Sequence, residues 1–119
     1  ERSEISVVSD QVGSPTYAED LARAIVTIME NDDRGMCEGV YHFSDEGVCS
    51  WYDFASEIVR ISRLPCRVKP VTTAEYPTRT RRPAYSVLDK SKIRNTFKVS
   101  VPDWKESLAA CMKELKANQ

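Results

Sequence analysis

The stretch Asp10–Ile28, DQVGSPTYAEDLARAIVTI, constrains the fold more than any other part of the sequence, because it joins a turn-rich loop directly to the clearest helical pattern. Gly13 can take a positive φ without steric cost, and Pro15 fixes its own φ and keeps the residue before it extended. Thr16 and Glu19 have the spacing of a capping box, which predicts a helix N-terminus with free backbone N–H groups. Such a corner suits a polar or anionic ligand, and it also occurs in ordinary strand-to-helix connections.

The helix after this loop is expected to span about Tyr17–Glu30 and to end in the polar segment Asn31–Gly35. Its apolar residues recur at helical spacing and predict one buried stripe, formed by Ala18, Leu21, Ala22, Ile25, Ile28 and Met29. A β-branched run predicts a strand at Ile5–Val8, and a second strand is expected at Gly39–Phe43. His42 lies in that second strand, has no triad pattern near it in sequence, and is interpreted as a structural histidine.

The second half of the chain continues the alternation of helices and strands. Ser50 is expected to cap a helix that ends at Leu64-Pro65, with Asp53 in its first turn. Further elements are expected in this order: a strand at Cys66–Val71, a strand at Tyr85–Leu88, a short helix at Asp89–Asn95, and a last helix capped by Ser100 or Asp103. The pattern predicts an α/β fold with a small mixed sheet and three main helices, in a single domain over residues 1–119 with one core.

Composition excludes several classes of protein. With 41% hydrophobic and 29% charged residues the chain is globular, and a net charge of −1 without a block of like charge gives no support for general binding to nucleic acid or membrane surfaces. No apolar run approaches the ~18 residues of a membrane span, and no secretory signal is present. Because the four cysteines form no C-x-x-C pair and there is one histidine, we expect no zinc cluster, reduced thiols and a cytoplasmic location.

The segment Thr72–Pro83, TTAEYPTRTRRP, is irregular and rich in arginine. Thr72–Glu75 could form one capped helical turn, and Arg79, Arg81 and Arg82 follow within a short span. Three guanidinium groups in a proline-bounded loop can hold a phosphate or carboxylate through forked hydrogen bonds. A solvated basic loop, or arginines that pair with surface acids, would give the same pattern.

The motifs of a complete catalytic site are missing from this sequence. Its four glycines never fall in G-x-G-x-x-G or P-loop spacing, and there is no G-x-S-x-G elbow. None of the five tyrosines has a lysine four residues later. The residues present therefore predict binding of a polar, phosphorylated ligand, with no catalytic residue, metal site or cofactor site within the chain.

Four segments together resemble one family: VVSDQVGSPTYAEDLARAI, GVYHFSDEGVCSWYDFASEI, TAEYPTRTRRPAYSVLDKSKI and VPDWKESLAACM. Their order and spacing are similar to the carboxy-terminal part of the dTDP-4-dehydrorhamnose reductases, which are extended short-chain dehydrogenases/reductases. The resemblance covers nearly the whole chain. It implies the substrate-binding lobe of an extended Rossmann-fold reductase that uses NADPH to reduce the 4-keto group of a dTDP-sugar, giving dTDP-L-rhamnose.

The resemblance also implies that an amino-terminal Rossmann domain, absent from this chain, binds NADPH and carries the catalytic Tyr/Lys pair. The residues assigned to the wall of the sugar-nucleotide cleft are Gln11, Gly13, Pro15 and Thr16. Arg81 and Arg82 are assigned to the diphosphate, with Tyr76 packed beside them. Trp51 and Tyr52 are expected to hold their helix in place.

Two other functions fit the same resemblance less directly. The chain could belong to a non-catalytic regulatory subunit like the β-subunit of methionine adenosyltransferase, which resembles this family, or it could be a stand-alone binding module. In the first interpretation the partners are a dTDP-sugar and the chain's own Rossmann domain. Without that domain, apolar surface is expected to be exposed, so self-association of the chain is also expected.

Overall fold

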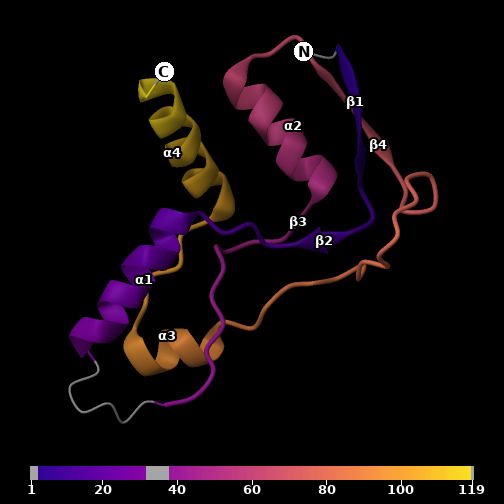
Figure 1. Cartoon of the computed structure of the whole chain (residues 1–119). Coiled ribbons are helices and arrows are strands. Elements are labelled where there is room, and N and C mark those ends of the chain that lie inside the picture. Colours follow the sequence, from indigo (N-terminus) through magenta and orange to yellow (C-terminus); the bar gives the residue numbers. More distant parts are fainter. Residues whose placement is uncertain (1–2, 32–37, 119) are drawn as a thin grey trace.

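The computed structural model describes residues 3–31 and 38–118, and Figure 1 shows their arrangement. The elements follow in the order β1 (Glu4–Val8), β2 (Val12–Gly13), α1 (Ala18–Asn31), β3 (Cys49–Ser50), α2 (Trp51–Ser62), β4 (Arg67–Val71), α3 (Ser91–Phe97) and α4 (Trp104–Ala117). None of the helices in these two ranges has the length and apolar character that a membrane crossing requires.

The strands pair in both directions. β1 and β4 run parallel, from the pair Glu4↔Arg67 to the pair Val8↔Val71, and α2 connects toward β4 beside them (Figure 1). β2 and β3 form a short antiparallel pair in which Gly13 lies opposite Cys49. The predicted α/β class with three main helices is confirmed, and within the described ranges the strands divide between two two-stranded sheets.

Buried apolar residues form two separate clusters rather than the single core that we predicted. One joins α1 to α3 through Ala24, Ile93, Phe97 and Val99, and the other joins β3 to α4 through Cys49, Trp104 and Leu108. The radius of gyration is 17.0 Å, whereas a compact domain of this length has about 13–14 Å. The extended shape follows from the two clusters, because neither gathers all the helices around it.

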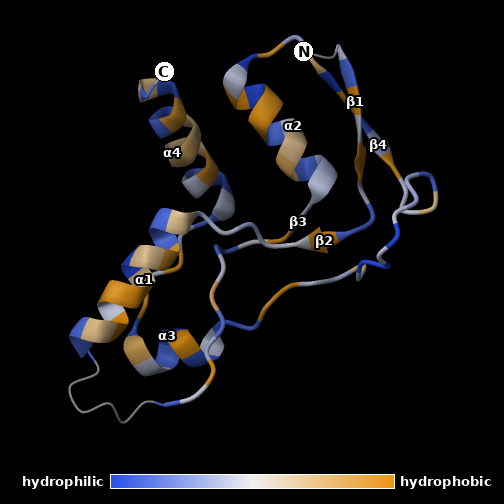
Figure 2. Cartoon of the chain, viewed as in Figure 1, coloured by the Kyte–Doolittle hydropathy of each residue, from blue (hydrophilic) through white to orange (hydrophobic). Residues whose placement is uncertain are grey.

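The apolar stripe predicted for α1 is largely exposed. The buried side of the helix carries Asp20 and Ala24, and the exposed fractions of Leu21, Ile25 and Met29 are 39%, 49% and 74%. Figure 2 shows that α1 alternates between orange, hydrophobic and blue, hydrophilic positions along its length. The spacing was helical as predicted, but α3 packs against the small-residue side at Ala24.

The strand predicted at Gly39–Phe43 is wrong for the described residues, because this segment pairs with no other strand. The segment still alternates between partly buried and exposed side chains. Tyr41 and Phe43 pack against the first cluster, and Val40 is 72% exposed. The strand predicted at Tyr85–Leu88 reduces to one bridge, between Tyr85 and Val12. Both segments have the strand pattern, but strand formation also needs a neighbouring strand, which the sequence pattern does not supply.

Capping at two helices follows the sequence. Ser50 and Asp53 form a complete capping box at α2, and Asp103, not Ser100, caps α4 by accepting the Lys105 N–H at 3.0 Å. The capping box predicted at Thr16 is not formed. The N–H of Tyr17 instead donates to Oδ2 of Asp45 at 3.0 Å, so a residue 28 positions away serves this helix end. Of the predicted breaker, Asn31 ends α1, and residues 32–35 lie outside the described residues.

Candidate functional site

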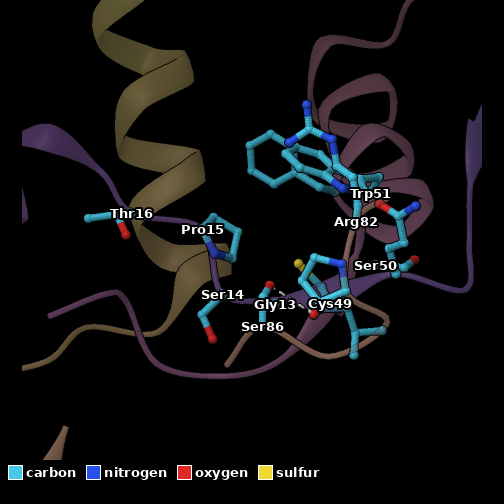
Figure 3. Close-up of a pocket in the computed structure, with 13 residues that line it drawn as sticks. Gly13, Ser14, Pro15, Thr16, Cys49, Ser50, Trp51, Arg82 and Ser86 are labelled. Atoms are coloured by element: carbon cyan, nitrogen blue, oxygen red, sulfur yellow. Dashed lines mark hydrogen bonds between the residues drawn. The ribbon is translucent and has the colours of Figure 1, made fainter. Parts of the chain in front are cut away.

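A cavity of about 560 Å³ opens where three separate segments meet. The Gln11–Thr16 loop forms one wall, the start of α2 with β3 forms the second, and residues 82–86 form the third. Figure 3 shows these side chains converging from the three segments. The loop that the sequence marked as most constrained therefore lines this cavity.

Backbone hydrogen bonds hold the first and third walls together. The N–H of Val12 donates to the carbonyl of Ala84 at 2.8 Å, and the N–H of Ser86 donates back to the carbonyl of Val12 at 2.9 Å. Ser14 Oγ donates to the Gly47 carbonyl at 2.6 Å and fixes the loop from the other side. Segments more than 70 positions apart thus form one surface.

Gly13 is required for a reason other than the one we predicted. The φ of Gly13 is not positive. Among the described glycines, Gly39 and Gly47 are the ones with a positive φ. A Cβ built on Gly13 would lie 2.6 Å from Oγ of Ser86, a distance that real Cβ atoms essentially never show. Glycine here leaves room for the Ser86 side chain rather than permitting an unusual turn.

The arginine-rich segment contributes one of its arginines to the pocket. Arg82 and Pro83 line it, whereas Arg81 and Tyr76, which the resemblance assigned to the same site, are exposed and are not among the lining residues. None of the ion pairs found in the described ranges involves Arg82, so its guanidinium is available to an anion.

The turn before the arginines forms as predicted and is fastened to the loop. The hydroxyl and N–H of Thr72 donate to Oε1 of Glu75, which reproduces a capped turn. Asp10 accepts from the N–H of Thr73 at 3.0 Å and from its hydroxyl at 2.6 Å, and these bonds lower the pKa of Asp10 below its usual value. Gln11 Nε2 donates to Thr73 Oγ1 at 3.2 Å, so this lining residue also orients the turn.

The second wall is largely apolar and includes a residue that was expected only to hold its helix in place. Trp51 is 57% exposed and lines the pocket with Phe54, whereas Tyr52 is not among the lining residues. Trp51 is the first residue of α2, so its side chain projects from the helix end instead of packing against α4. Cys49 lies beside it, and burial raises the pKa of its thiol to about 11, which keeps the sulfur neutral and unreactive.

A polar cluster behind the pocket was not predicted. The ammonium of Lys90, 5% exposed, donates to the Asp45 carbonyl at 2.8 Å and to Ser44 Oγ at 3.2 Å, and lies 3.3 Å from Oε1 of Glu46. Arg94 pairs with the other oxygen of Glu46, and these partners, Arg94 first, lower the pKa of Glu46 to about 2. Local sequence gives no signal for contacts across more than 40 positions. The burial of Lys90 is explained by these polar partners, which only the fold brings together.

The pocket is equipped to bind rather than to react. Its titratable lining groups are the Arg82 guanidinium and the Cys49 thiol, so it contains no acid–base pair. No group of three or more metal-ligating side chains occurs in the two described ranges. The sequence has no glycine-rich phosphate loop, and the residues present therefore do not fit a dinucleotide cofactor. An elongated ligand with a planar or apolar part and an anionic part fits these walls.

The fold and this pocket define an α/β domain with a cavity suited to a ligand. The chain belongs to the RmlD substrate binding domain family, whose model matches residues 1–117. This match spans the loop, the start of α2 and the arginine-rich segment, which are the three walls of the pocket.

Relatives of known name agree with the family. The chain is 42% identical over 113 residues to spore coat polysaccharide biosynthesis protein SpsK of Bacillus subtilis, with 95% of this chain and 38% of that protein covered. It is 40% identical over 116 residues to a dTDP-4-dehydrorhamnose reductase of Aggregatibacter actinomycetemcomitans, with 90% and 39% covered.

The fold is shared with solved structures of the same family. A dTDP-4-dehydrorhamnose reductase from Clostridium acetobutylicum has a TM-score of 0.88 at 39% identity, and the match covers 97% of this chain and 40% of that one. A Bacillus anthracis enzyme of the same name, solved in complex with NADP, has a TM-score of 0.85 at 38% identity, with 95% and 39% covered. The chain thus spans about two fifths of the length of these relatives.

Proposed function

We propose that this chain is the dTDP-sugar-binding part of an NADPH-dependent dTDP-4-dehydrorhamnose reductase that acts in dTDP-L-rhamnose biosynthesis in the cytoplasm. The observation that carries the proposal is the pocket, in which a constrained loop, an aromatic wall and an unpaired guanidinium converge. The names of the relatives favour this function over a regulatory subunit of another enzyme.

In this proposal Gln11, Gly13, Pro15 and Thr16 form the wall of the sugar-nucleotide cleft, and Arg82 holds the diphosphate. Arg82 is exposed, so the guanidinium–diphosphate interaction is screened by water and is worth far less than it would be in a buried site. Arg81 and Tyr76, which are exposed and are not among the lining residues, take their assigned roles only if the remainder of the protein encloses them.

The remaining three fifths of a family protein would bind NADPH and carry the residues that transfer protons. We place its contact with this chain on the free side of α1, where Leu21, Ile25 and Met29 are exposed. An exposed apolar stripe on a helix is typical of a surface that another element covers.

Titration calorimetry with dTDP tests the proposed site. We expect weak binding by this chain, and about fivefold weaker binding by Arg82→Ala, which corresponds to roughly 1 kcal/mol for one solvent-exposed charge-assisted contact. Arg81→Ala is the matched control, since it removes the same charge outside the pocket, and we expect less than a twofold change. Equal effects of the two variants would show that only net charge matters and would refute the assignment of Arg82.

A further inference from the structure

Two carboxyl groups meet in the interior of the chain without a cation between them. Asp20, in the first turn of α1, is 8% exposed, and Asp45 is 1% exposed. Ser107 of α4 donates its hydroxyl to Oδ2 of Asp20. Oδ1 of Asp45 has no hydrogen-bond partner within the described residues, although every other side-chain oxygen and nitrogen as deeply buried there has one. An unpartnered carboxylate oxygen at this depth is costly.

Asp45 also fixes one corner of the pocket. Its N–H donates to the carbonyl of Pro15 at 3.0 Å, and its Oδ2 accepts from the N–H of Tyr17 at 3.0 Å. Pro15 and Thr16, the residues between these two bonds, line the cavity. One residue therefore holds the end of the pocket loop by both main chain and side chain, and it does so at the point where the loop enters α1.

The charged groups around Asp45 do not neutralise its carboxyl group. Lys90 donates to the Asp45 carbonyl and pairs with Glu46, and Arg94 pairs with Glu46 as well. The α4 side contributes the neutral hydroxyl of Ser107, and the α1 side contributes Asp20. Two like charges in a dry site cannot both persist, so one carboxyl retains its proton. Burial first, and then the hydrogen bond with Asp20, raise the pKa of Asp45 to about 7.

We infer that Asp45 is the positioning residue of the pocket loop and that it works as a neutral carboxyl group, whose Oδ1–H donates to Asp20 while Oδ2 accepts from Tyr17. This arrangement gives the orphaned oxygen a partner and satisfies both acids with one proton. The inference rests on the proposed function only in that the loop it fixes is taken to be the ligand-binding wall.

The sign of the pH dependence follows from this arrangement. In the unfolded chain Asp45 ionises at its ordinary pKa of 3.8, and in the folded chain it ionises near 7. Between these values the unfolded chain releases a proton that the folded chain retains, so stability falls as pH rises and becomes constant above about pH 7. Glu46 acts in the opposite sense, because its lowered pKa makes the chain lose stability only below about pH 4.5.

Denaturant unfolding from pH 5 to pH 8.5, without ligand, separates this role from simple packing. For the unaltered chain we expect the unfolding equilibrium constant to rise by up to about tenfold per pH unit between pH 5 and 7, and then to level off. Asp45→Asn places a permanent N–H donor toward Asp20 and keeps an acceptor for Tyr17. We expect this variant to fold and to lack this slope.

Asp45→Ala removes the side-chain bonds to Tyr17 and Asp20, so it should be less stable than Asp45→Asn at every pH. If Asp45→Ala does not fold, the comparison of the unaltered chain with Asp45→Asn still tests the inference. A second measurement is the infrared band of a protonated carboxyl group, which the unaltered chain should show at pH 6 and Asp45→Asn should lack. An identical pH slope in the Asp and Asn proteins, or the absence of that band, would overturn the inference. Because unfolding is measured without dTDP, this result is independent of whether the pocket binds a sugar nucleotide.

Discussion

The contact between Gly13 and Ser86 provides a test of how tightly the pocket walls are packed. Gly13→Ala would place a methyl group 2.6 Å from Ser86 Oγ, and the next atom, Ser86 Cβ, lies at 3.9 Å. The clash thus involves one hydroxyl oxygen at the end of a short side chain. That hydroxyl donates to the Val12 carbonyl at 3.2 Å, so the hydrogen bond is lost if the side chain rotates away.

The expected magnitude combines three contributions. Loss of one exposed hydrogen bond costs roughly 0.5–1.5 kcal/mol, and residual overpacking adds up to about 1–3 kcal/mol if the segments must move apart. Because the φ of Gly13 is not positive, alanine also reduces the entropy of the unfolded chain and returns about 0.4–1 kcal/mol. We therefore expect Gly13→Ala to destabilise the chain by about 1 kcal/mol.

The matched variant is Ser86→Ala, which removes the obstructing oxygen. In that background Gly13→Ala should be neutral or slightly stabilising, so the coupling free energy of the pair is about 1 kcal/mol or more. Urea unfolding of the four proteins in the double-mutant cycle measures this quantity. Additivity within about 0.3 kcal/mol would refute the reasoning, because it would mean that the two walls do not touch at this point.

Two further outcomes are expected. Ser50→Ala removes the capping hydroxyl, which accepts the Asp53 N–H at 2.9 Å, and should lower the free energy of unfolding by about 1 kcal/mol in urea, whereas Ser91→Ala, at the start of α3, should have little effect. Sedimentation of this chain should show self-association that increases with concentration, because the free side of α1 is apolar. The double variant Ile25→Lys, Met29→Lys should remain monomeric, and unchanged association would place the contact elsewhere.

Sequence reasoning succeeded where the interactions are local. The capping box of α2 and the turn at Thr72–Glu75 involve residues three positions apart, so the sequence contains both partners within one short window. The pairing of β1 with β4 was not specified, but strands were predicted at Ile5–Val8, from its β-branched run, and at Cys66–Val71. The pocket loop was singled out because Pro15 fixes its own φ and keeps Ser14 extended, whereas the positive φ foreseen for Gly13 is not used.

Sequence reasoning failed where a contact depends on a residue far away in the sequence. The helix end at Tyr17 is capped by Asp45 instead of Thr16, and no pattern near Thr16 announces a carboxylate 28 positions later. Trp51 fits the apolar stripe of α2, but as the first helical residue it lies beyond the reach of α4 and projects into the pocket. For α1 the helical spacing was predicted correctly, but the wrong side of the helix was predicted to be buried. Hydrophobic spacing does not reveal whether the chain contains a neighbouring element that covers the apolar side.

The division of the interior into two apolar clusters has a consequence for cooperativity. The cluster around Phe97 and the cluster around Trp104 share no buried residue, and they are joined by directional polar bonds such as that from the Trp104 N–H to the Glu46 carbonyl at 2.9 Å. Each half can therefore open while the other stays ordered. A molecule seated in the pocket touches Trp51 beside one half and Thr16 at the entrance to the other, so its binding would make the two halves melt as one unit.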